Sequence, residues 1–209
     1  FMGLVGSEMC IRDRVKSKSL RPLVSLKSKF KKIGIVGSGL MGHGIAYVSS
    51  YYGFKVVLID NSKENVLTAF SKIEKIFKMD IKQNLFSNSQ MEKCLENIKV
   101  STDVSDLKGC DLVIEAVYED TALKGDVTIA AEKIMESSGV FSSNTSTIPI
   151  SKLATVSVRP ENFIGIHFFS PVHKMKLVEI IKSDNTSSNT LARTLDFINA
   201  IKKVPIVVN

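Results

Sequence analysis

The chain has 209 residues, 44% hydrophobic and 23% charged, a composition typical of one folded domain. No run approaches the roughly 18 consecutive apolar residues of a transmembrane helix, and three scattered cysteines indicate neither a disulfide framework nor a structural zinc site. The net charge of +7 lies entirely in residues 1–32, which hold nine Lys or Arg against Glu8 and Asp13. Because the remaining residues are neutral overall, they indicate neither a nucleic-acid nor a membrane partner.

Residues 1–30 are rich in Ser, Lys and Arg and show no sustained helical or strand period. We expect them to form a basic leader, disordered and separate from a domain that spans residues 31–209. Three origins stay open: a linker from a preceding domain, an artefact suggested by the adapter-like string GSEMCIRDR at residues 6–14, and an organelle transit peptide.

From residue 31 onward, strand and helix signals alternate. Strands are predicted at 32–37, 54–60, 111–117, 140–142, 163–169, 175–181 and 204–208, where β-branched and apolar residues run together. Helices are predicted at 39–52, from 61 or 62 to about 97 with a break near 88, at 186–200, and around the apolar positions Leu123, Val127, Ala130 and Ile134. This alternation predicts an α/β fold with a doubly wound, mostly parallel sheet covered on both faces.

A glycine motif, GxGxxG, links the first predicted strand to the first helix at Gly37, Gly39 and Gly42. In this context the three glycines make a tight turn, admit a pyrophosphate to the backbone and allow close helix packing, and the helix N-terminus favours phosphates. Asp60 ends the second strand, where a carboxylate binds ribose hydroxyls and repels a 2′-phosphate. Together these features predict a Rossmann-type domain that binds NAD rather than NADP.

Polar residues also mark the later strands. The run Ser142–Ser146 follows a short strand, and taken alone it is more typical of a turn with a helix cap. His167 and Glu179 each stand alone among apolar residues of two successive strands. A lone histidine is commonly a satisfied core residue, but a buried carboxylate is costly unless it is paired. Pairing of these two side chains would give an imidazole base that a carboxylate orients.

The motifs GSGLMGHGIAY, SNTSTI and GIHFFSPVHKMKLVEII resemble the L-3-hydroxyacyl-CoA dehydrogenase family of fatty-acid β-oxidation, over about residues 31–209. The segment AVYEDTALKGDV is most similar to the dehydrogenase part of bifunctional hydratase–dehydrogenase proteins. The spacing from Ser146 to His167 and from His167 to Glu179 also keeps that of the family. The resemblance implies NAD-dependent oxidation of L-3-hydroxyacyl-CoA to 3-ketoacyl-CoA.

The same resemblance implies roles for individual residues. His167 would be the catalytic base, Glu179 its carboxylate partner, and Ser146 a hydroxyl that contacts the substrate and the nicotinamide end of NAD. Lys124 could otherwise be a solvated helix lysine, and no metal ligand is implied. The residues implied in cofactor binding are Gly37, Gly39, Leu40, Met41, Gly42, Asp60, Val117, Tyr118, Glu119, Lys124, Ser146 and Ser170.

Two departures from the family pattern are expected to matter. Ser170 stands where the family commonly has Asn, and its shorter side chain is expected to weaken or shift a hydrogen bond on the nicotinamide side. The chain also ends at Asn209, before the Pro-Gly-Phe turn, catalytic Asn and C-terminal helical domain of the family. That domain would form the homodimer or multifunctional complex and much of the acyl-CoA cleft. His43 and His173 match no catalytic position and are predicted to lie in loops.

Other functions remain open from the sequence. A dehydrogenase of free β-hydroxy acids would use a lysine base in a later region, whereas His167 with Glu179 favours the acyl-CoA enzymes. A non-catalytic NAD-binding or structural module is the alternative from a different class, since the second domain is expected to be absent. The expected compartment is the cytoplasm in a bacterium, and the mitochondrial matrix or peroxisome in a eukaryote.

Overall fold

The computed structural model describes residues 21–24 and 30–208. Of the leader residues that the structure describes, Arg21 forms an ion pair with Asp196 at 2.8 Å, and Phe30 is only 5% exposed. The hydrophobic core therefore includes Phe30, one residue before the expected domain boundary. Residues 1–20 and 25–29 of the predicted leader, and with them its predicted disorder, lie outside the described residues.

The described residues form an eight-stranded sheet in the order β3-β2-β1-β4-β5-β6-β7-β8. Neighbouring strands pair in parallel except β6 with β7, so the prediction of a mostly parallel sheet is confirmed. From β1 the chain builds outward to β2 and β3 on one side and to β4 on the other, which creates a crevice at the strand ends. The strands are β1 (Lys32–Val36), β2 (Lys55–Ile59), β3 (Ile98–Ser101), β4 (Leu112–Glu115), β5 (Val140–Ser143), β6 (Phe163–Phe168), β7 (Leu177–Ile181) and β8 (Val204–Val208).

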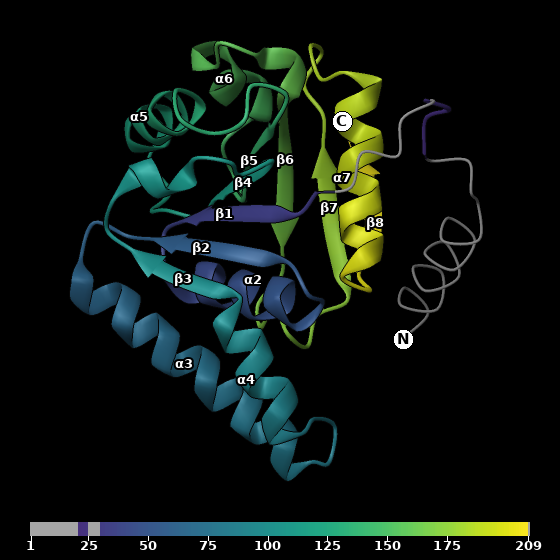
Figure 1. The fold of residues 1–209 in the computed structure, drawn as a ribbon. Helices are drawn as coiled ribbons and strands as arrows, with labels where there is room; N and C mark the ends of the chain where they lie inside the picture. Colours follow the sequence, from purple (N-terminus) through teal and green to yellow (C-terminus); the bar gives the residue numbers. More distant parts are fainter. Residues whose placement is uncertain (1–20, 25–29, 209) are drawn as a thin grey trace.

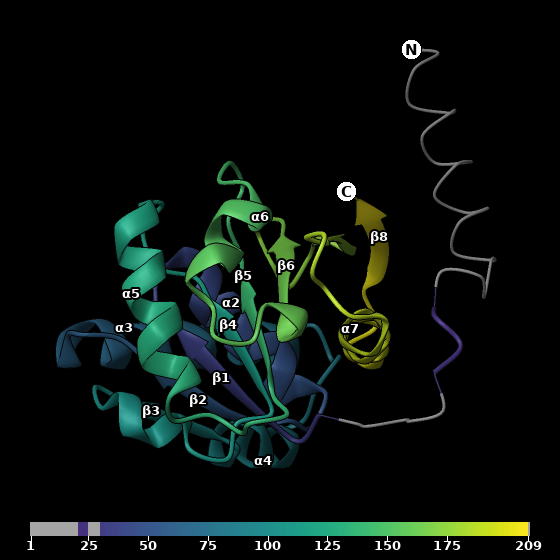
Figure 2. The same ribbon diagram turned by 90° about the horizontal axis from the view of Figure 1, so that it is seen from above.

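Helices cover both faces of the sheet (Figures 1 and 2). The α-helices are α2 (Leu40–Tyr51), α3 (Lys63–Lys82), α4 (Asn88–Glu96), α5 (Thr121–Glu132), α6 (Ile150–Leu153) and α7 (Ser188–Ala200), and the 3-10 helices are η2 (Val104–Leu107), η3 (Ala154–Val156) and η4 (Pro160–Asn162). One core contains residues of α2, α3 and α7, such as Ile45, Ile73 and Ile198, whereas α5 and α6 contribute Ala131 and Leu153 to a second core. Among the described residues, no helix is both long and apolar enough to cross a membrane.

The capping residues explain where the long helical run divides. Ser62 accepts a hydrogen bond from the backbone N–H of Asn65 and starts α3. Ser87 and Gln90 form a capping box that starts α4, close to the predicted break near residue 88. The sequence does not predict β3, because this edge strand has only four residues, Ile98–Ser101, directly after a helix.

The loop prediction for His43 is wrong. His43 lies in the first turn of α2 and is 8% exposed. Its Nδ1 lies 2.7 Å from the carbonyl oxygen of Gly39. The helix begins at Leu40, directly after the second glycine of the motif, so this histidine is packed rather than in a loop. His173 does lie in the connection between β6 and β7, as predicted.

Candidate active site

The glycine loop between β1 and α2 leaves no room for side chains on its inner side. Gly37 has a φ of +100°, and a Cβ on Gly42 would lie 1.8 Å from the carbonyl oxygen of Gly37. A Cβ on Gly39 would meet nothing within 4 Å, so the loop is open on its outer side. Because Gly39 is the N-cap of α2, this opening lies at the positive end of the helix. The loop therefore fits a dinucleotide pyrophosphate.

Asp60 lies directly after β2 and is held by hydrogen bonds from three residues. Its Oδ2 accepts from the backbone N–H of Ser38 at 2.9 Å and from its hydroxyl at 2.7 Å, and its Oδ1 accepts from Asn65 at 3.0 Å and from Ser62 at 3.3 Å. Burial raises the pKa of Asp60, but these hydrogen bonds lower it further than burial raises it. The side chain is therefore a fixed carboxylate at neutral pH.

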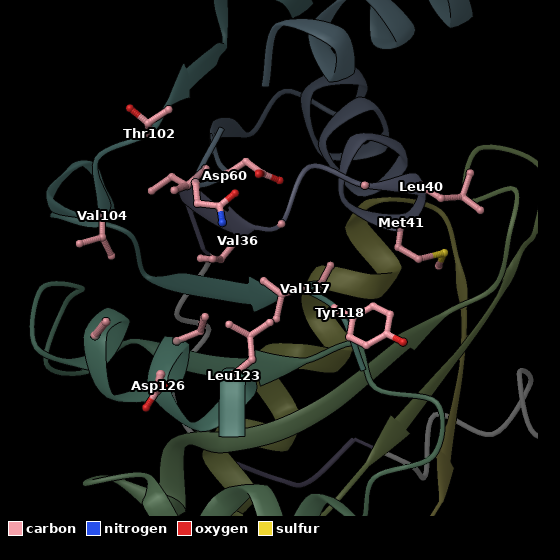
Figure 3. Close-up of a pocket in the computed structure, with 17 residues that line it drawn as sticks. Val36, Leu40, Met41, Asp60, Thr102, Val104, Val117, Tyr118, Leu123 and Asp126 are labelled. Carbon is pink, nitrogen blue, oxygen red and sulfur yellow. The ribbon is translucent and has the colours of Figure 1, made fainter. Parts of the chain in front are cut away.

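A cavity of about 740 Å³ extends from Asp60 across the glycine loop. Figure 3 shows Asp60 and Thr102 toward one end and Met41 and Tyr118 toward the other, with Val117 between them. Its extended shape, along the ends of β1, β2 and β4, suits a dinucleotide better than a compact ligand.

The apolar stripe of α5 borders both this cavity and the second core, against which Val127 packs. Leu123, Val127 and Ala130 line the cavity, and Leu123 is 40% exposed. The helix also buries the polar residues Lys124 and Thr128. The apolar positions therefore predict the helix correctly, although part of the stripe lines a cavity.

A second cavity of about 320 Å³ adjoins the first and shares Met41, Ala116 and Val117 with it. It lies where the turns after β4, β5 and β6 come together. This arrangement joins the cofactor cavity to the polar residues of the later strands. The predicted site residues that line it besides the shared ones are Glu119, Ser146, His167 and Ser170.

His167 and Glu179 are direct register partners in the antiparallel pair β6–β7. The Nδ1 of His167 lies 2.8 Å from the Oε2 of Glu179, and the two side chains are 19% and 35% exposed. Because Nδ1 faces the carboxylate, a neutral ring donates from Nδ1 and leaves Nε2 as its free acceptor. The prediction that Glu179 is buried is wrong, because every second residue of β7, including this one, lies on a partly exposed face of the strand. The antiparallel register of β6 and β7 nevertheless brings Glu179 to His167.

Lys124 is buried between two glutamates and is only 1% exposed. Its Nζ lies 2.8 Å from the Oε1 of Glu115 and 3.1 Å from the Oε2 of Glu119. The alternative of a solvated helix lysine is therefore wrong. Glu115 is not among the residues predicted for the site, although it too is a lone carboxylate in an apolar strand, the feature that marked Glu179.

Glu119 also holds the turn that carries Ser146. Its Oε1 accepts hydrogen bonds from the backbone N–H groups of Ser146 and Thr147, at 3.0 and 3.1 Å, and from the Thr145 hydroxyl. Burial raises the pKa of Glu119, but the bond from Thr145 and the contact with Lys124 lower it more, to about 2. This carboxylate thus fixes the turn after β5 beside the second cavity.

The structure brings the predicted site residues into one region, in two layers. Gly42, Lys124 and Glu179 lie behind the cavity walls and support the residues in front of them. The remaining predicted residues line one or both cavities: Gly37, Gly39, Leu40, Met41, Asp60, Val117, Tyr118, Glu119, Ser146, His167 and Ser170.

Known proteins are similar to this chain in sequence and in fold. The family model described as "3-hydroxyacyl-CoA dehydrogenase, NAD binding domain" matches residues 32–209. The fatty acid oxidation complex subunit alpha of Idiomarina loihiensis is 37% identical over 195 residues, which cover 93% of this chain and 27% of that protein. The protein of the same name from a Psychrobacter strain is 34% identical over 206 residues, which cover 99% of this chain and 28% of that protein.

A solved structure agrees with these matches. The crystal structure of the (S)-3-hydroxybutyryl-CoA dehydrogenase of Ralstonia eutropha superposes with a TM-score of 0.84 at 37% identity, covering 86% of this chain and 64% of that one. The chain spans about a quarter of the length of the two fatty acid oxidation complex subunits. The family match covers the whole sheet from β1 to β8 together with the glycine loop, Asp60 and the His167–Glu179 pair. The chain belongs to the NAD-binding domain family of the 3-hydroxyacyl-CoA dehydrogenases.

Proposed function

We propose that this chain supplies the NAD site and the proton-transfer residues for oxidation of L-3-hydroxyacyl-CoA to 3-ketoacyl-CoA in fatty-acid β-oxidation. The observation that carries the proposal is the His167–Glu179 pair, at 2.8 Å, whose histidine lines a cavity that adjoins the glycine-loop cavity. A base and a dinucleotide site side by side are what hydride transfer from an alcohol requires.

The cofactor is proposed to lie along both cavities. Asp60 would bind the ribose hydroxyls at one end, and the pyrophosphate would lie over the glycine loop between Leu40 and Met41 on one side and Val117 and Tyr118 on the other. The nicotinamide end would then enter the second cavity, beside Ser146 and Ser170. When bound there, NAD supplies the acceptor for a hydride from the substrate.

The chain's own residues handle the proton. The Nε2 of His167 accepts the proton of the substrate's 3-hydroxyl group while carbon 3 loses a hydride, which leaves the ketone. Glu179, at 2.8 Å from Nδ1, stabilises the positive charge that the imidazole gains. General-base catalysis of this kind contributes about 10²- to 10⁴-fold. The Ser146 hydroxyl, on the turn that Glu119 fixes, would position the substrate oxygen.

The names of the relatives support a larger assembly and a compartment. Both curated relatives are alpha subunits of a fatty acid oxidation complex, which supports a multifunctional complex as the working form of this protein. Both are bacterial, which favours the bacterial cytoplasm among the three expected compartments. The alternative of a non-catalytic module is disfavoured, because a structural module has no need of the base and carboxylate pair.

The test is acetoacetyl-CoA-dependent oxidation of NADH, followed by cofactor absorbance. Because the relatives are much longer, the assay uses the chain itself and a chimera in which the remaining sequence of the Idiomarina relative follows Asn209. His167→Gln is expected to lower turnover about a hundredfold or more while NADH affinity changes less than about twofold. His173→Gln, in the loop between β6 and β7, is the matched control and should keep full turnover. An undiminished rate in His167→Gln would remove the base assignment.

A further inference from the structure

The charges around the second cavity are unevenly distributed. Among the described residues that line it, Glu119 is a carboxylate and none is a lysine or an arginine. The nearest buried ammonium, that of Lys124, lies behind the wall and is shared between Glu115 and Glu119. The carboxylate of Glu179 also lies behind the wall, paired with His167. The net charge of the buried group around Lys124 adds to the negative charge that the cavity experiences.

Glu115, Lys124 and Glu119, here called the charge triad, carry a net charge of −1. Both oxygens of Glu115 face donors: Oε1 accepts from Lys124 at 2.8 Å and from the backbone N–H of Val117 at 2.7 Å, and Oε2 accepts from the Ser143 hydroxyl at 2.6 Å. This pattern suits an ionised carboxylate, which only accepts hydrogen bonds. Glu115 is 0% exposed, so water screens its charge poorly.

The triad lies where the nicotinamide ring is proposed to bind. The two cavities share Met41, Ala116 and Val117. Asp60 lies toward the opposite end of the first cavity (Figure 3). The nicotinamide ring is positively charged in the oxidised cofactor and neutral in the reduced one. A buried negative group beside it attracts the first form and not the second.

We propose that the charge triad strengthens binding of oxidised NAD relative to NADH, and that Glu115 supplies the uncompensated charge. The inference rests on the proposed function, because it requires the nicotinamide to enter the second cavity. Without Glu115, the charges of Lys124 and Glu119 cancel. Glu115 itself is fully buried and lines neither of the two cavities, so it acts on the cofactor only through its electric field and through Lys124.

The experiment measures the dissociation constants of NAD and NADH separately, by calorimetric titration of the 209-residue chain. The informative quantity is their ratio, oxidised over reduced, because a general loss of structure changes both constants. Glu115→Gln keeps the size and the hydrogen-bond acceptor of the side chain but removes its charge. This variant is expected to raise the ratio by about threefold or more. A tenfold rise would equal a shift of about 30 mV in the potential of the bound two-electron couple.

Glu132→Gln is the matched control. Glu132 lies on α5, the helix that carries Lys124, and is 7% exposed. It accepts hydrogen bonds from the Ser157 hydroxyl and from the backbone N–H of Val158. It stands eight residues after Lys124, about 12 Å along the helix. Removing this carboxylate should leave the ratio unchanged, even if it lowers stability.

Glu119→Gln provides a second variant, because its side chain is 33% exposed and the change is easier to accommodate than at Glu115. It also makes the triad neutral and is expected to raise the ratio in the same direction. An unchanged ratio in folded Glu115→Gln and Glu119→Gln, with both cofactor forms still bound, would overturn the inference alone. Failure of the wild-type chain to bind either form would overturn the proposed function and the inference together.

Discussion

The replacement Lys124→Met tests the buried charges of the site through stability alone. Methionine occupies a similar volume, so packing loss is small, but Glu115 keeps no positive partner at 0% exposure. Breaking a buried ion pair costs about 3–5 kcal/mol. Glu115 retains the hydrogen bonds from Val117 and Ser143, each worth about 1 kcal/mol, which places the expected loss near the lower limit, about 3 kcal/mol.

The assay is urea unfolding at neutral pH, followed by circular dichroism. In the double variant Lys124→Met with Glu115→Gln, the unpaired charge is gone, so about half of the lost free energy of unfolding should return. Lys133→Met, at the exposed end of the same helix, is the control and should change stability by less than about 0.5 kcal/mol. A loss of unfolding free energy below about 1 kcal/mol for Lys124→Met, or strictly additive effects in the double variant, would contradict a buried ion pair between Lys124 and Glu115.

Two further predictions concern the glycine loop and Glu119. In Gly42→Ala the new Cβ would lie 1.8 Å from the carbonyl oxygen of Gly37, so the loop must move and NADH should bind about tenfold more weakly. An unchanged dissociation constant for NADH in a fluorescence titration would contradict this packing. The pKa of Glu119 is lowered from 4.5 in the unfolded chain to about 2 in the folded one, so its contribution to stability is complete above about pH 5 and disappears as the pH falls through about 2. The stability difference between the wild type and Glu119→Gln should shrink over that range, and a difference independent of pH would contradict the shift.

The sequence predicts most of the fold because periodicity is strong in its long elements. The β-branched runs of β1, β2 and β4 and the capping residue Ser62 are local signals that tertiary contacts do not overrule. The short edge strand β3 is not predicted, since four residues give too little alternation.

The sequence likewise predicts some parts of the candidate site and not others. The glycine loop, Asp60 and the paired positions of His167 and Glu179 follow from motifs with a fixed structural context. The charge triad does not, because no local pattern shows that Lys124 points inward, although Glu115 could have been singled out as a lone carboxylate in an apolar strand. Its members come from a strand, a helix and the turn between them, so their contacts depend on how α5 packs against the sheet.

The most direct measurement is a fluorescence titration of the chain with NADH and, in parallel, with NADPH. The site described here predicts that NADH binds and that NADPH binds about tenfold or more weakly, because the fixed carboxylate of Asp60 repels a 2′-phosphate. Asp60→Asn, which keeps a hydrogen-bond acceptor and removes the charge, should bring the two affinities within about threefold of each other. No binding of NADH, or equal affinities for both cofactors in the wild-type chain, would contradict the assignment of this site.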